Sequence, residues 1–158
     1  MTTKASSNDL VDVYLEVGTK REFAAALEWP GWCRSAKSEE HALDSLAAYA
    51  ERYAAVAREA GVVFPYTRAM PFHVVERLPG TAGYTDFGAP GAVATRDGDP
   101  LNAPEATRLA VLVQAAWVVF ERVAAMAPAE LRKGPRGGGR DRDQVCHFVR
   151  FLGHRHSR

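Results

Sequence analysis

Residues 132–148, "RKGPRGGGRDRDQVCHF", combine residue types that bind anions. Three consecutive glycines would let backbone amides approach an anion, and basic side chains on both sides would add positive charge. A mononucleotide-binding P-loop is excluded, because no Lys-Ser or Lys-Thr pair follows the last glycine and the preceding segment has the pattern of a helix. The residues of the candidate anion site are Lys133, Arg136, Gly137, Gly138, Gly139 and Arg140.

The same stretch has a simpler interpretation as a flexible connector kept soluble by its charge. Residues 132–158 hold eight of the 20 basic residues and two of the 19 acidic ones, so this segment carries +6 and the other 131 residues carry −5. A basic segment on an acidic body can bind anions or nucleic acid. Because no aromatic residues interleave the arginines, stacking on single strands is poorly supported, and we expect only weak, sequence-independent binding.

The end of the chain contains possible metal ligands. Thiolate and imidazole bind zinc, and "CHFVRFLGHRHSR" (146–158) contains Cys146, His147, His154 and His156. On a helix, however, Cys146 and His147 point in different directions, and nothing in the sequence fixes the last residues. We therefore predict a disordered basic terminus and no cofactor, with a divalent metal held in part by His147 as the alternative.

Other chemistry-bearing residues lack a catalytic pattern. Trp29 and Trp32 flank the Pro30-Gly31 turn, which indicates a packed corner or a surface for a partner. Cys33 has no His or Asp placed by sequence to activate it, so we expect an inert thiol. The stretch "TDFG" (85–88) lacks every other kinase motif and predicts a loop turn. No GxSxG, HExxH or paired-carboxylate motif is present.

The elements that must position these residues follow from the hydrophobic pattern. We predict strands over 11–17, 21–27 and 72–78, a helix from Ser38 to about residue 60, a helix over about 104–127, and a short amphipathic segment over 141–152. The fold class is α+β, with a small antiparallel sheet packed on one long helix and then a partial helical region. The boundaries give a module over 1–78, a Gly/Pro/Ala/Asp-rich linker over 79–102 and a helical region over 103–158.

Composition favours a cytoplasmic protein that does not enter a membrane. The opening "MTTKASSNDL" is polar and lacks the apolar core of a signal peptide. No uninterrupted apolar run approaches the roughly 20 residues that span a bilayer. The two cysteines lie far apart in sequence and form no CxxC motif, which argues against a disulfide framework.

Residues 11–60 resemble the HicB-type antitoxin module. The match is Pro30-Gly31, where the family has a corner followed by a short strand, and then "EEHAL" (39–43), where the family has an acidic helix start. The family fold is a small strand-rich sheet with a helix against it, related in shape to ribonuclease H without its catalytic carboxylates. The resemblance implies a partner-binding module and carries over no catalytic residue.

The whole chain also looks like an uncharacterised actinobacterial family. The shared stretches are "VYLEVGTKR" (13–21), "LEWPGWCRS" (27–35), "VVERLPG" (74–80), "TDFGAP" (85–90) and "LRKGPRGGGRD" (131–141). The C-terminal half of these proteins looks similar to DinB-like helical bundles, which include metal-dependent and thiol-dependent enzymes. That resemblance implies a metal-binding histidine after the Gly-rich segment, for which His147 is the nearest candidate. A complete bundle needs about four helices, whereas the sequence of this chain predicts two helices and one short helical fragment.

Taken together, the sequence favours a cytoplasmic binding or regulatory protein without catalysis of its own. Its partner would be a protein met through the sheet edge or the second helix, or a second copy of the chain, because an incomplete bundle leaves apolar helix faces uncovered. A DinB-like metal-dependent enzyme, of the small-thiol transferase or hydrolase class, is the alternative. Weak nucleic-acid binding through the basic C-terminal segment is the second alternative.

Overall fold

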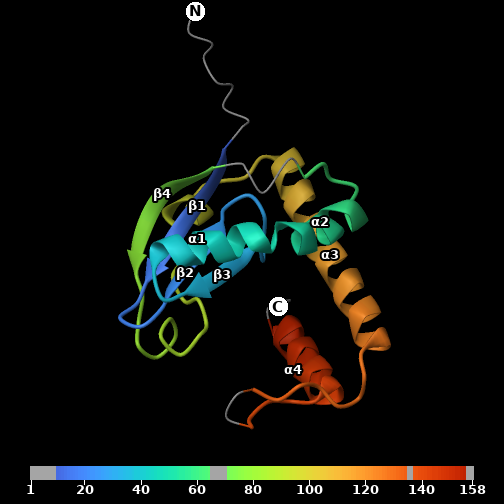
Figure 1. Cartoon of the computed structure of the whole chain (residues 1–158). Helices are drawn as coiled ribbons and strands as arrows, with labels where there is room; N and C mark the ends of the chain where they lie inside the picture. Colours follow the sequence, from blue (N-terminus) through green and yellow to red (C-terminus); the bar gives the residue numbers. More distant parts are fainter. Residues whose placement is uncertain (1–9, 65–70, 135–136, 156–158) are drawn as a thin grey trace, which may run out of the picture. The chain divides into compact units, whose positions relative to one another are not determined.

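The computed structural model describes residues 10–64, 71–134 and 137–155, with side chains up to residue 150. The chain divides into two units, Met1–Ala116 and Trp117–Arg158. The first unit contains a four-stranded sheet and two helices, α1 and α2, and begins a third helix, α3. The second contains the rest of α3 and the last helix, α4 (Figure 1). The α+β class is confirmed.

The sheet has the order β3-β2-β1-β4, and its strands are β1 (Val11–Val17), β2 (Glu22–Ala26), β3 (Cys33–Ala36) and β4 (Phe72–Pro79). β1 pairs antiparallel with β2 and β2 with β3, as the hairpin pattern predicts. The expectation of a purely antiparallel sheet is wrong, because β4 pairs parallel with β1. The two helices between β3 and β4 supply the long crossover that parallel pairing requires.

The single helix expected from Ser38 to about residue 60 is two helices, α1 (Glu39–Ala48) and α2 (Ala50–Glu59). Ser38 caps the first one as expected, since its side chain accepts a hydrogen bond from the amide of His41. The break coincides with a tertiary contact: the indole Nε1 of Trp32 donates to the carbonyl oxygen of Leu46 at 3.0 Å. In a continuous helix that oxygen would accept from the amide of Ala50.

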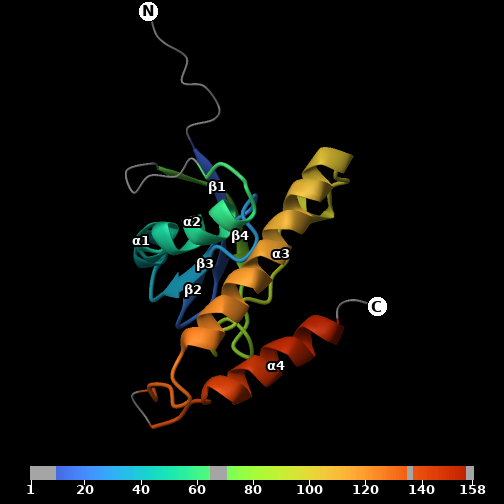
Figure 2. The same ribbon diagram turned by 90° about the vertical axis from the view of Figure 1, so that its right-hand side faces the viewer.

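The hydrophobic core lies between the sheet and the helices. Val13 and Leu15 are fully buried on one face of β1, against Leu46 of α1 and Leu112 of α3 (Ala103–Met126). Five aromatic rings from the corner, α2, the segment after α2 and β4 pack against one another at centroid separations of 4.7–5.9 Å. These rings are Trp29, Trp32, Tyr53, Phe64 and Phe72. Figure 2 shows α1 and α2 together on one side of the sheet.

The opposite face of the sheet is partly covered by residues 80–98, which we call the strap. Glu16 of β1 accepts hydrogen bonds from the amides of Gly91 and Ala92, and Glu76 of β4 accepts from the amide of Thr95. The strap lies within the expected 79–102 linker, and the structure groups it with the first unit; the predicted domain boundaries stay a prediction. The Gly- and Pro-rich composition of the strap reflects tight turns held on the sheet.

The second unit is held by polar contacts between its two helices. The guanidinium of Arg150 on α4 (Arg142–Arg155) donates twice to the carboxylate of Glu121 on α3, at 3.1 and 2.7 Å. Arg142 also donates to the carbonyl of Ala127 at 3.1 Å. The amphipathic segment expected over 141–152 is thus a helix that starts one residue later and extends three further.

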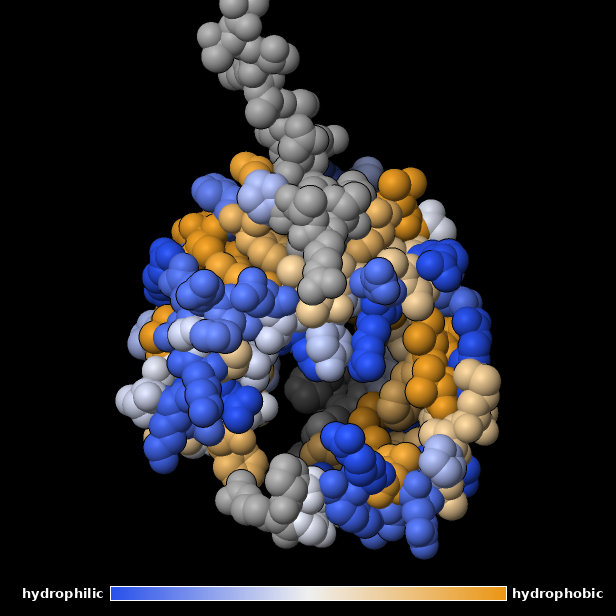
Figure 3. All heavy atoms as spheres, in the orientation of Figure 1, coloured by the Kyte–Doolittle hydropathy of each residue, from blue (hydrophilic) through white to orange (hydrophobic). Residues whose placement is uncertain are grey.

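α3 is long and apolar enough to cross a membrane by length and composition alone. Its most apolar 18-residue window has a mean hydropathy of 1.7, and 11% of that window is buried. Figure 3 shows orange, apolar side chains along α3. The exposed large ones are Val113, Val118, Val123 and Met126. One such helix is weak evidence for a membrane protein, so the expectation of a protein outside membranes stays a prediction.

Candidate functional site

The strongest anchor of the strap is a buried carboxylate. Glu16 follows Leu15 on β1, so its side chain lies on the face opposite the core, and only 1% of it is exposed. It accepts from the hydroxyl of Thr85 and from the amides of Gly91 and Ala92, the latter two at 2.8 Å. Burying a carboxylate without partners costs several kcal/mol. Here the three donors offset that cost and fix the strap at two points.

A second carboxylate ties the strap to the turn between β1 and β2. Asp86 accepts from the hydroxyl of Thr19 and from the amide of Lys20, the latter at 2.8 Å. These hydrogen bonds, that of Thr19 first, hold the pKa of Asp86 below its usual range. The approach is close enough to require glycine, because a Cβ atom on Gly18 would lie 2.8 Å from the carbonyl oxygen of Arg21 and closer still to Asp86.

The far end of the strap is held by ion pairs and hydrogen bonds. Thr95 donates through its amide and hydroxyl to Glu76, and these bonds hold the pKa of that carboxylate below its usual range. Arg96 reaches the carboxylate of Asp12 at 3.1 Å and that of Glu28 at 3.2 Å. Acidic side chains of β1, β4 and the corner after β2 therefore fix the strap along its length.

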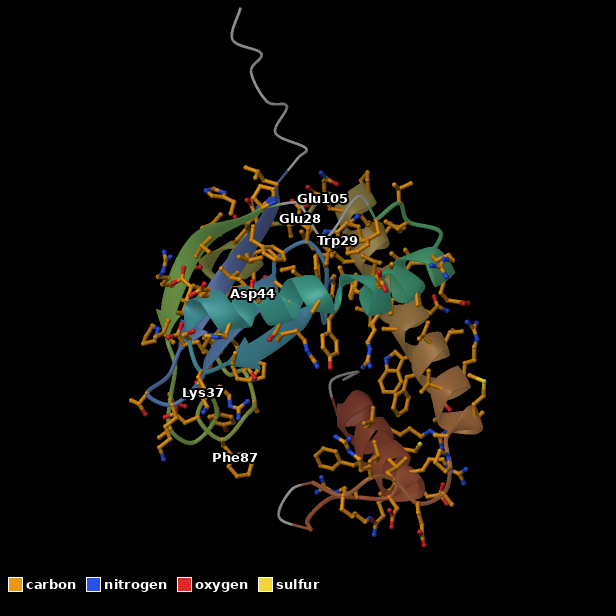
Figure 4. All side chains as sticks on the ribbon, viewed as in Figure 1. Glu28, Trp29, Lys37, Asp44, Phe87 and Glu105 are labelled. Carbon is orange, nitrogen blue, oxygen red and sulfur yellow. The ribbon has the colours of Figure 1, made fainter. Side chains whose placement is uncertain are left out.

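Between the anchors the strap presents two aromatic rings to solvent. We call residues 84–88, "YTDFG", the aromatic turn. Its Phe87 is 86% exposed and its Tyr84 is 64% exposed, while Thr85 between them is fully buried. The amides of Gly88 and Ala89 both donate to the carbonyl of Tyr84 at 3.0 Å, which closes the turn. In Figure 4 the ring of Phe87 projects from the loop away from the sheet.

Two ionisable groups near Glu16 have raised pKa values. Burial raises the pKa of Cys33 to about 11, with the nearby Glu16 adding to the effect, so this thiol is protonated near neutral pH. That agrees with the inert thiol expected from the sequence. Burial also raises the pKa of Tyr14 to about 12. Within the described residues, no three His, Cys, Asp or Glu side chains gather closely enough to hold a metal ion.

The tryptophans of the corner are buried. Trp29 is 6% exposed and Trp32 is 2% exposed, and both rings pack on Tyr53. The hydroxyl of Tyr53 donates to the carbonyl of Pro30 at 3.0 Å, which closes the corner. The rings pack as the corner interpretation predicts and leave little surface exposed, and the partner-surface alternative stays a prediction.

The described part of the Gly-rich basic stretch makes several contacts within its own unit. The amide of Gly134 donates to the carbonyl of Gly138, and the amide of Gly137 donates to the carbonyl of Gly134, both at 2.8 Å. Lys133 pairs with Asp141. Arg140 lies over the ring of Phe148, at 4.4 Å from its centroid. Gly139 continues the loop at a φ of 145°, and Arg136 lies outside the described residues. These internal contacts favour the connector interpretation of the described part of the loop, and the anion site stays a prediction.

His147 lies on α4 at an open depression of about 500 Å³. The depression is lined by Arg140, Asp143, Gln144, His147 and Phe148. One acid, Asp143, is therefore one helical turn away, and its carboxylate pairs with Arg142. The side chains of His154 and His156 lie outside the described part. The described residues thus offer His147 too few ligands for a metal site of its own.

Comparison with known proteins identified no relative: no family model, no curated protein and no solved structure matches the chain. The resemblances to HicB-type and DinB-like proteins therefore stay predictions, as do the cytoplasmic location and the kinds of partner.

Sequence reasoning missed the residues that form this site. The sequence predicted no role for Glu16, and it predicted only a loop turn for the "TDFG" segment (85–88). One signal was present: a loop rich in Gly and Pro that also contains two aromatic rings, Tyr84 and Phe87. Binding residues lie disproportionately on loops, and aromatic residues are enriched at protein–protein interfaces.

Proposed function

We propose that this protein is a binding or regulatory protein without catalysis of its own, and that it contacts a protein partner through the aromatic turn. The observation that carries the proposal is the buried carboxylate of Glu16, which fixes a loop whose Phe87 ring is 86% exposed. The carboxylates of Glu16 and Asp86 accept hydrogen bonds from the chain itself and hold the loop in place. The loop holds the rings of Tyr84 and Phe87 in a fixed position at the surface.

Fixing the loop before binding favours a tight contact. Ordering an interface side chain on association costs about 0.5–1.5 kcal/mol, and a loop already held in place avoids much of that cost. Tyr and Phe also bring a large contact area with few rotatable bonds. An exposed ring held by Glu16 and Asp86 is thus suited to fill a pocket on a partner, where a few aromatic residues commonly dominate the binding energy.

The sheet edges, which the sequence analysis named together with the second helix as partner surfaces, are less suitable. β3 is four residues long, and α1 packs against it. β4 is longer, but its register shifts opposite Val13 and Tyr14, which indicates a β-bulge, and the strand ends at Pro79. Bulges, charges and proline are features that discourage the addition of another strand. The HicB resemblance, if correct, would also imply a partner-binding module.

Location and the kind of partner remain parts of the proposal. Both cysteines are free thiols, which suits a reducing compartment such as the cytoplasm. A second copy of the chain is an alternative partner, and the exposed apolar side chains of α3 would favour it.

The test is site-specific photo-crosslinking in the cells that make the protein. Phe87→p-benzoylphenylalanine places the probe on the aromatic turn, and Val63→p-benzoylphenylalanine serves as the control, because Val63 is 85% exposed and lies outside the turn. We expect a discrete protein adduct from position 87 that is missing from position 63. With the isolated partner, Phe87→Ala should weaken binding about tenfold or more, as for a central aromatic contact.

Two outcomes would contradict the proposal. Identical adducts from positions 87 and 63 would mean that the turn has no preferred partner. Adducts made solely between copies of the chain would replace a separate protein partner by self-association. Glu16→Gln should reduce the specific adduct even though position 16 is buried, since it loosens the loop that presents the ring.

A further inference from the structure

Two arginines converge on one tyrosine at the junction of α1 and α2. The guanidinium carbon of Arg34, on β3, lies 3.5 Å from the centroid of the Tyr49 ring. That of Arg52, on α2, lies 4.7 Å from the same centroid. Cation–π attraction operates within about 6 Å of a ring. Both cations are therefore held on one side chain, although their like charges repel each other.

Among the described residues, neither arginine has a compensating acid. Within the described part of the chain, no carboxylate lies within 4 Å of Arg34 or Arg52. Glu51 precedes Arg52 directly and pairs with neither guanidinium. Elsewhere in the same unit the pattern differs, since Arg77 pairs with Glu39 and Arg96 pairs with two carboxylates. The Tyr49 junction thus concentrates positive charge without a counter-ion.

The donors of both guanidinium groups are also unused by described residues. A cation at 3.5 Å from a ring centroid contacts the ring with its flat face, and a guanidinium carries its five N–H donors around its edge. The side chains of Arg34 and Arg52 donate no hydrogen bond to another described residue. The ring of Tyr49 thereby orients two sets of donors and leaves them available.

We propose that Arg34 and Arg52, positioned by Tyr49, form a binding site for a phosphate dianion. A guanidinium fork matches the geometry of a phosphate group and binds it by paired, charge-assisted hydrogen bonds. Two guanidinium groups neutralise a dianion, and the dianion removes their mutual repulsion. The phosphate is either free or the terminal group of a monoester, because the same donors recognise both. This site uses none of the residues of the aromatic turn, so it stands independently of the proposed partner contact.

The test is a titration of the ¹⁵N-labelled chain with sodium phosphate at pH 7.5, followed through the arginine Nε–Hε resonances. Sodium chloride at equal ionic strength is the reference. We expect saturable shifts at Arg34 and Arg52 with phosphate and none with chloride. Phenyl phosphate in a second arm distinguishes the source: tighter binding than phosphate indicates a monoester, and equal or weaker binding indicates the free ion.

The variants separate a built site from general surface charge. Arg34→Gln and Arg52→Gln should each weaken phosphate binding about tenfold, the effect of losing one charged hydrogen-bonding partner. Arg58→Gln, a change of the same charge on the same helix α2, should leave binding within about twofold. Equal losses in all three variants, or no saturable shift in the unmodified chain, would overturn the proposal. Unchanged tryptophan fluorescence of each variant establishes that the fold is retained.

Discussion

The indole Nε1 of Trp32 donates a 3.0 Å hydrogen bond to the carbonyl oxygen of Leu46, and the helical segment breaks three residues later, at Tyr49. That contact joins the corner after β2 to α1 and places the aromatic side chain of Tyr49 at the junction where Arg34 and Arg52 meet it. One buried hydrogen bond thus links the core to the candidate phosphate site.

Trp32→Phe should destabilise the first unit and let α1 and α2 join into one helix. The variant removes the indole donor and part of a ring that is 2% exposed. Losing the partner of a buried polar group costs about 1–3 kcal/mol. Urea unfolding measures the loss. Trp29→Phe is the matched control, since the Trp29 indole N–H donates to no described residue; a loss as large in that variant would show that ring size alone matters.

Glu16→Gln should release the strap without unfolding the sheet. The amide group of glutamine can accept with its oxygen alone, while its NH₂ would face donors from Thr85, Gly91 or Ala92. We expect a loss of about 2 kcal/mol in the free energy of unfolding. Hydrogen exchange at the amides of residues 91 and 92 should quicken at least tenfold. Glu40→Gln, at an exposed position of α1, should change neither quantity.

Gly80→Ala tests the close approach of the strap to β4. A Cβ atom at position 80 would lie 2.7 and 2.8 Å from the Cγ2 and Cβ atoms of Thr85 and nearer still to its hydroxyl. Thr85 must then move away from Glu16, and overpacking of this kind costs about 1–3 kcal/mol. Gly83→Ala, where the added Cβ meets nothing within 4 Å, should stay within about 0.5 kcal/mol. Equal stability of the two variants would mean that the strap is not held where it lies.

The sequence predicts the elements that depend on local hydrophobic pattern, and it does not predict features that depend on contacts between residues distant in the sequence. β1, β2, β4 and α3 follow from local periodicity, and their bounds agree with expectation within a residue or two. β3 has four residues, too few to show alternation. The break at Tyr49 coincides with the contact from Trp32, 17 positions away in the sequence, and no local pattern encodes it. Helix propensity alone predicts a continuous helix there.

The candidate site was harder to predict for the same reason. Glu16 is polar at an alternate position of β1, as on a strand with one solvated face, and it is buried solely because residues 80–98 return to cover it. Thr85 and Gly91 contact it from 69 and 75 positions away. Charge counts along the chain likewise drew attention to the basic C-terminal segment. In the structure, Lys133 and Arg140 of that segment already have partners.

Acid should loosen the strap through Asp86. Because the hydrogen bond from Thr19 lowers the pKa of Asp86 in the folded chain, this carboxylate stabilises the fold above its unfolded pKa. Its contribution is lost as the pH falls through the folded pKa, below about 4. A ¹³C titration of the Asp86 carboxyl measures the shift directly. Thr19→Val should return the pKa towards its ordinary value; an unchanged pKa in that variant would exclude the hydroxyl as the main cause.

Metal analysis of the purified chain separates the binding protein proposed here from a DinB-like enzyme. His147 lies beside Asp143 on α4, and the described residues contain no group of three ligands. We therefore expect well under one divalent metal ion per chain by mass spectrometry, with the same content in His147→Ala. His73→Ala is the control, because His73 is an exposed histidine already bonded to Asp12. About one metal ion per chain, lost in His147→Ala and kept in His73→Ala, would replace the non-catalytic proposal by the metalloenzyme alternative. Structural zinc and catalytic zinc alike take at least three protein ligands, so such a result would require further ligands from outside the described side chains.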